Sequence, residues 1–178
     1  MSIFLQQLPA LIGVVIGALG SYLAVVRSDR ARFRRERAAQ WEERRLAVYG
    51  DYAGALKSCV VLTYRVASGL GNDPHPHPLT PEEAAPLMAA AAANVDSHWE
   101  QLLMLGGPRV VERARAWIVV IREMERFLST GTLDLRAWEA LLERQRACRE
   151  GYYRAVRQDL DLPEGPAAHG PLPSADPV

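Results

Sequence analysis

The residues of this sequence that come closest to a chemical site are two histidines in a proline-rich segment. His75 and His77 stand one residue apart in GLGNDPHPHPL, and Asp73 precedes them. Imidazole and carboxylate groups are zinc ligands, but a zinc site needs three or four of them, held in place by further hydrogen bonds. His98 and Asp96, in a later helix-forming segment, are the residues that would complete the set. The alternative is a loop that binds no metal, and the incomplete ligand set favours this alternative.

His98 has two further interpretations, because it falls on the apolar face of its expected helix. It is either a core histidine that hydrogen-bonds within the protein or a pH- or ligand-responsive residue in a pocket between helices. The sequence has no phosphate-binding glycine motif and no nucleophile elbow. We therefore name no catalytic residue, expect no cofactor and expect that the protein is not an enzyme. An enzyme with an unrecognised site is the weakest alternative.

The chain is organised around an uncharged apolar run at residues 9–26, PALIGVVIGALGSYLAVV. A helix of this length is just long enough to cross the hydrocarbon core of a bilayer, which is about 30 Å thick. The segment before it has no basic residue and no signal-peptide cleavage pattern follows it, so residues 1–26 are predicted to be a retained transmembrane anchor. A buried helix of a soluble protein is the alternative, although such helices usually keep a polar stripe.

Three small residues of this run, Gly13, Gly17 and Ser21, recur every four residues and share one helix face. Such a face lets two transmembrane helices approach closely, so these residues are candidates for self-association in the membrane. The alternative is that small residues are simply common in transmembrane helices.

The carboxyl flank of the run is strongly basic, whereas the amino flank carries no Lys or Arg. Its arginines are Arg27, Arg30, Arg32, Arg34, Arg35 and Arg37. By the positive-inside rule this predicts a single-pass protein of the cell membrane with its N-terminus outside and the rest of the chain in the cytoplasm. We expect anionic lipid headgroups, rather than nucleic acid, to be the partners of Arg27, Arg30, Arg34, Arg35 and Arg37.

The remainder of the chain predicts an all-α fold. The transmembrane helix is expected to continue through a basic stalk (27–40) into a long cytoplasmic helix, and this helix packs with three more (81–105, 108–129 and about 134–160) as an antiparallel four-helix bundle over 41–160. Thr80 with Glu83 forms a capping box, and either Thr132 or Asp134 caps the last helix. The tail, 161–178, is rich in Pro, Gly and Ala and is expected to be disordered.

Apolar residues at three- and four-residue spacing define the expected inner faces. In the first helix the face runs from Trp41 and Leu46 through Val48 and Tyr52 to Val66. In the others it is formed by Met88, Ala91, Val95, His98, Leu102 and Leu105; by Val110, Ala114, Trp117, Ile121, Met124 and Leu128; and by Trp138, Leu141, Leu142, Gln145, Cys148, Tyr152 and Val156. Cys59 and Cys148 both fall on these faces and are expected to be buried thiols. Trp99 lies one residue off its face and is the first candidate for an exposed partner surface.

A single span, an arginine-rich stalk and the segment WEERRLAVYGDYAGAL leading into helices resemble small uncharacterised single-pass bacterial membrane proteins. The resemblance implies anchoring but no activity and no site residues. We therefore expect a non-enzymatic interaction or scaffold module that binds a protein partner or a second copy of itself. The alternative is a ligand- or metal-responsive membrane-bound sensor with a pocket near His98.

Overall fold

The structure, a computed structural model, describes residues 37, 40–72 and 75–163 of the 178. The chain divides into two compact units, Met1–Arg44 and Arg45–Val178, and the second contains the bundle. The predicted anchor (1–26), residues 27–36 of the predicted stalk and residues 164–178 of the predicted tail lie outside the described residues. Among the residues that are described, no helix combines the length and the apolar character needed to cross a membrane.

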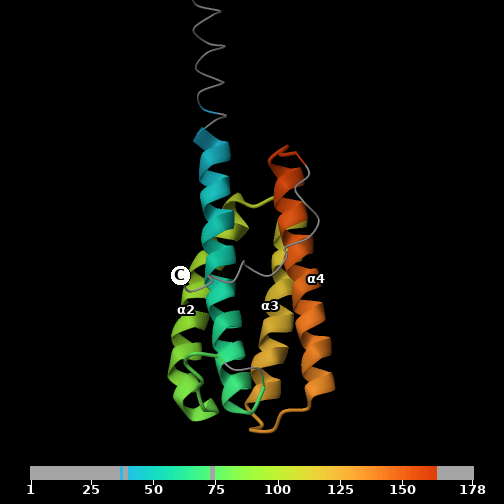
Figure 1. Ribbon diagram of the computed structural model, residues 1–178. Helices are drawn as coiled ribbons and strands as arrows, with labels where there is room; N and C mark the ends of the chain where they lie inside the picture. Colours follow the sequence, from blue (N-terminus) through green and yellow to red (C-terminus); the bar gives the residue numbers. More distant parts are fainter. Residues whose placement is uncertain (1–36, 38–39, 73–74, 164–178) are drawn as a thin grey trace, which may run out of the picture. The chain divides into compact units, whose positions relative to one another are not determined.

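Four helices form the described part of the second unit. They are residues 45–69, α2 (Pro81–Leu105), α3 (Pro108–Leu128) and α4 (Leu135–Asp159). They alternate in direction, down, up, down and up in the view of Figure 1. No residue in the described ranges belongs to a strand, so the predicted all-α fold with four helices is confirmed for this part of the chain.

The helix starts follow from capping side chains that the sequence already indicates. The Thr80 hydroxyl accepts a 3.2 Å hydrogen bond from the Glu83 amide, and the Glu83 carboxylate accepts a 2.9 Å bond from the Thr80 amide. Asp134 caps α4 by accepting from the amides of Arg136 and Ala137 at 2.9 and 3.2 Å. Both groups of bonds satisfy amides that the first helical turn leaves without partners. The capping box is confirmed, and of the two caps considered for the last helix the structure has Asp134.

The core lies where the apolar faces of all four helices meet. One cluster of buried side chains gathers around Tyr52, Leu102, Trp117 and Tyr152, and a second gathers around Trp138 at the other end of α4. The predicted face of α3 is buried in full: Val110, Ala114, Trp117, Ile121, Met124 and Leu128. The three-and-four spacing therefore identified the inner face of α3 correctly.

Two expected core positions in the first helix are wrong. Trp41 and Leu46 are each 52% exposed, and burial of the apolar face begins at Val48. The exposure of Leu46 follows from the contacts of its neighbour Arg45. Arg45 hydrogen-bonds to the last residue of α2 and to the last residue of α4. Both neighbouring helices end at this level, so neither α2 nor α4 extends far enough to bury Leu46.

Fewer residues are buried on α2 than on α3 or α4. Only Ala84, Val95 and Leu102 are buried on it. The other expected positions, Met88, Ala91, His98 and Leu105, are half-buried. Much of this helix is alanine, and a methyl group reaches too short a distance to widen the buried face.

A polar cluster, which we call the end cluster, closes the bundle at the end where the second unit begins. It comprises Arg45, Tyr49, Gly107 and Asp159. The Tyr49 hydroxyl donates a 2.5 Å hydrogen bond to the Asp159 carboxylate and accepts a 3.1 Å bond from the Gly107 amide. Arg45 pairs with Asp159 and donates a 3.1 Å bond to the Leu105 carbonyl. The start of α3 is thereby fixed against the end of α4.

Candidate functional site

The residues predicted to contact the membrane fall almost entirely outside the described ranges. This applies to Gly13, Gly17 and Ser21 and to the headgroup candidates Arg27, Arg30, Arg34 and Arg35. Arg37 is described as an exposed helical residue. These predictions are therefore carried forward as proposals.

The histidine loop uses its polar groups to hold its own backbone. The Nδ1 atom of His75 accepts a 3.1 Å hydrogen bond from the His77 amide, and the His75 amide donates to the Ser68 hydroxyl at 3.0 Å. The His77 carbonyl accepts a 2.7 Å bond from Nε of Arg65. Asp73 lies outside the described residues. The structure therefore shows His75 stabilising a turn.

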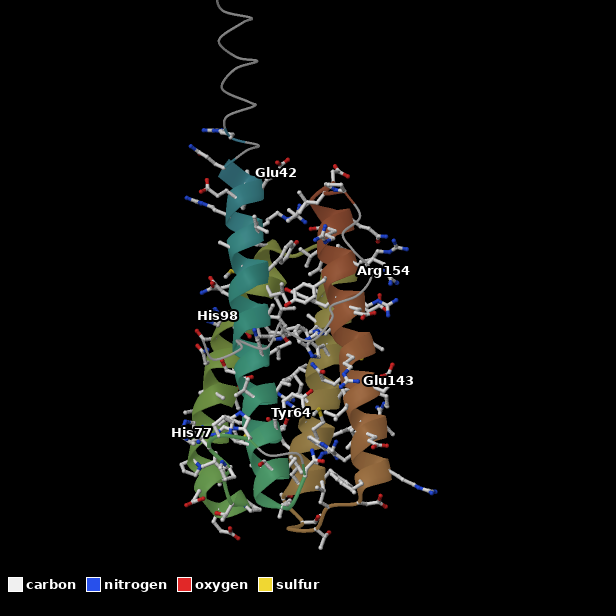
Figure 2. All side chains as sticks on the ribbon, viewed as in Figure 1. Glu42, Tyr64, His77, His98, Glu143 and Arg154 are labelled. Carbon is white, nitrogen blue, oxygen red and sulfur yellow. The ribbon has the colours of Figure 1, made fainter. Side chains whose placement is uncertain are left out.

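His98 lies far from this loop along the bundle. Figure 2 shows His98 on α2 well above His77. Its Nδ1 atom is buried and has no hydrogen-bond partner among the residues that the structure describes, and the nearby Asp96 faces Arg122 of α3 at 3.8 Å. Within the described ranges, no group of three or more His, Cys, Asp or Glu side chains is placed to hold a metal ion. The structure thus does not bring together the metal candidates His75, His77 and His98.

Trp99 is not the exposed aromatic that its sequence position suggested. It is half-buried, with its ring 5.8 Å from that of Tyr52 and with the Arg115 guanidinium 5.7 Å above its face. These contacts attach α2 to the first helix and to α3. Trp99 therefore belongs to the packing of the bundle.

The feature with the chemical character of a site is a groove between α3 and α4, on the outside of the bundle. It encloses about 530 Å³. Six charged or polar residues line it: Arg109, Glu112, Arg113, Glu150, Arg154 and Gln158. Figure 2 shows Arg154 projecting from α4 on the side away from α2. We call this feature the basic groove.

Three arginines give the basic groove its charge. Arg109 and Arg113 are one helical turn apart on α3, and Arg154 comes from α4. Within the described part of the chain, none of the three side chains has a hydrogen-bond or ion-pair partner. With Glu112 and Glu150 the lining carries three positive and two negative charges, so the groove has a net positive charge.

Small residues of α4 keep the groove open. Ala147, Gly151 and Ala155 recur every four residues and line it. A Cβ atom on Gly151 would lie 3.6 Å from Cδ and 4.0 Å from Nη1 of Arg113, so this guanidinium lies close to the helix backbone. A larger side chain at position 151 would occupy the space beside Arg113.

A second, shallower groove continues along the same seam towards the other end of the bundle. It shares Glu112 and Ala147 with the basic groove, and its other lining residues are four apolar ones and two arginines: Ala116, Val119, Val120, Cys148, Arg115 and Arg144. At its far side Arg144 of α4 pairs with Glu123 of α3 at 2.7 Å. Arg115 and Arg144, which line this second groove, contact Trp99 and Glu123, so along this seam the lining arginines without such a contact lie at the end that the end cluster fixes.

The sequence analysis missed the basic groove, although two signals for it are present. Arg109 and Arg113 are four residues apart, and the small residues of α4 have the same spacing. Arg109 and Arg113 lie on the outward face of α3, whereas the small residues of α4 run from the exposed Ala147 to the buried Ala155. In an amphipathic helix, the polar outward face is expected to contact solvent. Only the packing of α3 on α4 shows that these residues border one groove.

Comparisons with protein-family models, with curated proteins and with solved structures find no match to this chain.

Proposed function

We propose that this protein is a non-enzymatic, single-pass membrane protein whose helical bundle is a binding module on the cytoplasmic side. In this proposal residues 1–26 are the anchor, Arg27, Arg30, Arg34, Arg35 and Arg37 contact anionic headgroups, and Gly13, Gly17 and Ser21 support self-association. The apolar length and the one-sided arginines support the anchor and its orientation.

The observation that carries the binding role is the basic groove. It combines a concave surface of about 530 Å³ with three arginine side chains that have no partner in the described structure. Ligand sites are typically concave surfaces of this size with a few charged groups that fix orientation. The second groove along the seam is shallower, and at its far side the Arg144 side chain is already paired with Glu123.

The membrane part of the proposal is tested by fractionation of cells that produce the full chain. We expect the protein to remain with the membranes after a carbonate wash, and we expect a reporter fused behind Val178 to be active only in the cytoplasm. Release by carbonate, or a reporter that is active outside the cell, would remove the anchor and its orientation.

The binding part is tested by photo-crosslinking in cells. A photoreactive amino acid at Ala147 borders the basic groove, whereas Ala140 lies two turns earlier on α4 and Ala93 lies on α2, and both of these are exposed. We expect an adduct of defined mass at Ala147 that is lost when Arg154 is changed to Gln. Equal labelling at all three positions would show that the groove is not a binding surface.

One observation favours the sensor hypothesis: among the described residues, the buried Nδ1 atom of His98 has no hydrogen-bond partner. Neither groove described above includes His98. Metal analysis of the purified protein and of His98→Asn tests the metal version, which requires bound metal that the substitution removes. An apo protein unaffected by the substitution would eliminate it.

A further inference from the structure

We propose that the basic groove binds the phosphate group of a phosphate ester, with the guanidinium groups of Arg109, Arg113 and Arg154 as donors. The inference rests on the proposed function and deepens it, because it names the chemistry of the partner. The phosphate can belong to a lipid headgroup or to a soluble ester, and the experiment below distinguishes these two sources.

The chemical argument starts from the donors. A guanidinium presents a planar fork of N–H groups that matches two oxygens of a phosphate, and such charge-assisted pairs are among the stronger hydrogen bonds of proteins. Two of the three forks come from one face of α3 and the third comes from α4, so an anion in the groove is approached from both walls. A phosphate monoester carries about −1.5 to −2 charges near neutral pH, which suits a site with three arginines.

The arginines of the groove differ from five other arginines of the bundle, whose guanidinium groups have hydrogen-bond or ion-pair partners. Arg45, Arg144 and Arg146 are paired with Asp159, Glu123 and Glu143. Arg65 and Arg157 donate to backbone carbonyls. In contrast, Arg109, Arg113 and Arg154 have no such partner in the described part of the chain, even though Glu112 and Glu150 line the same groove.

The acidic residues restrict the class of ligand. Glu112 and Glu150 leave the groove with a net charge of about one positive unit, which is weak for a polyanion but sufficient for a single phosphate. Together with the carboxamide of Gln158 they accept hydrogen bonds from hydroxyl groups on the organic part of an ester. A groove of about 530 Å³ is large enough for the phosphate and for part of that group.

The test uses the full chain in phosphatidylcholine nanodiscs. In the soluble arm, inorganic phosphate and glycerol 3-phosphate are titrated and binding is measured by calorimetry. In the lipid arm, binding of the nanodisc-held protein to vesicles with and without phosphatidic acid is compared. Binding in either arm that depends on the groove arginines supports the proposal, and the arm in which it occurs identifies the source of the phosphate.

The substitutions Arg109→Gln, Arg113→Gln and Arg154→Gln each remove one charged donor. We expect each to weaken binding by about tenfold or more, from the usual contribution of a charged hydrogen bond. Arg136→Gln is the matched control, because Arg136 is exposed in the first turn of α4 and does not line the groove. An equal loss for Arg136→Gln and Arg154→Gln would show unspecific attraction and overturn the proposal.

Two further substitutions keep the three arginines and change the site in opposite directions. Gly151→Leu fills the space beside Arg113 and should abolish binding, whereas Glu150→Gln removes a negative charge and should tighten it severalfold. Thermal unfolding of each variant shows whether the fold is retained. Absence of phosphate binding in both arms overturns the inference, and the proposed function stands if the crosslink at Ala147 persists.

Discussion

The Tyr49 hydroxyl donates a 2.5 Å hydrogen bond to the Asp159 carboxylate and so joins the first helix of the bundle to the last residue of α4. Burial, with this hydrogen bond, raises the pKa of Tyr49, so the hydroxyl stays protonated as a donor. The two residues are distant in sequence, and they also hold the Gly107 turn from which α3 starts. The relative position of α3 and α4, and with it the basic groove, depends on this contact.

Removing the Asp159 carboxylate should destabilise the bundle. In Asp159→Ala the buried Tyr49 hydroxyl loses its acceptor, and the half-buried Arg45 guanidinium loses its only carboxylate partner in the described part of the chain. We expect the free energy of unfolding to fall by about 1–3 kcal/mol, measured by urea denaturation. Asp161→Asn is the control, because Asp161 is exposed, and it should leave stability nearly unchanged. Equal stability of the two variants would show that the end cluster contributes nothing.

Gly107 has a steric reason to be glycine. A Cβ atom there would overlap the Asp159 carboxylate, so Gly107→Ala should destabilise the protein by about 1–3 kcal/mol. Gly54→Ala is a matched control within a helix, because a Cβ at position 54 has open space around it and glycine is a poor helix former. It should stabilise by about 1 kcal/mol. Thermal unfolding of both variants tests the pair, and a neutral Gly107→Ala would contradict the contact.

The two cysteines should differ in reactivity. Burial raises the pKa of Cys59 to about 11, and its side chain is 1% exposed. Burial also raises the pKa of Cys148, which is only half-buried, while the nearby Arg144 and Arg113 act in the opposite direction. We therefore expect iodoacetamide at pH 8 to modify Cys148 well before Cys59, as followed by mass spectrometry of the native protein. Faster modification of Cys59 would mean that the first helix opens more readily than its packing indicates.

Glu125 should make stability depend on pH. Its pKa is raised from the ordinary value of 4.5, mainly by burial. The folded state therefore binds more protons than the unfolded state between 4.5 and the raised value, and stability falls as pH rises through this window. Glu125→Gln should be more stable than the wild type at pH 7, and the difference should vanish below pH 4.5.

Glu123→Gln is the control for this pH dependence, because Glu123 lies two residues away and pairs with Arg144 at 2.7 Å. Its substitution removes a favourable partner and should not stabilise the protein at pH 7. Denaturation curves across the pH range compare the two variants. A constant gain for Glu125→Gln at all pH values would exclude the ionisation of Glu125 as its cause.

The sequence predicted the local features of the bundle well and its outer surface poorly. Thr80, Glu83 and Asp134 are capping residues whose chemistry acts within one helical turn, so their roles follow from the sequence. The inner face of α3 could be predicted for the same reason, because the three- and four-residue spacing of its apolar residues is also a property of a single helix. Leu46 was misassigned because spacing does not tell where neighbouring helices end.

The sequence indicated the metal candidates but did not indicate the basic groove. His75 and His77 are adjacent in sequence, but the loop directs His75 Nδ1 to the His77 amide. The groove depends on how α3 packs beside α4, and the closeness of Arg113 to Gly151 cannot be predicted from either helix alone. The predicted anchor and the arginines of its basic flank other than Arg37 lie outside the described residues.

We propose that Arg109, Arg113 and Arg154 form one anion site between α3 and α4. Crystals of the full-length protein soaked with tungstate, an analogue of phosphate that scatters anomalously, provide the decisive measurement. We expect an anomalous peak within hydrogen-bonding distance of all three guanidinium groups. A groove without a peak, in which these arginines pair with Glu112 and Glu150 instead, would contradict it.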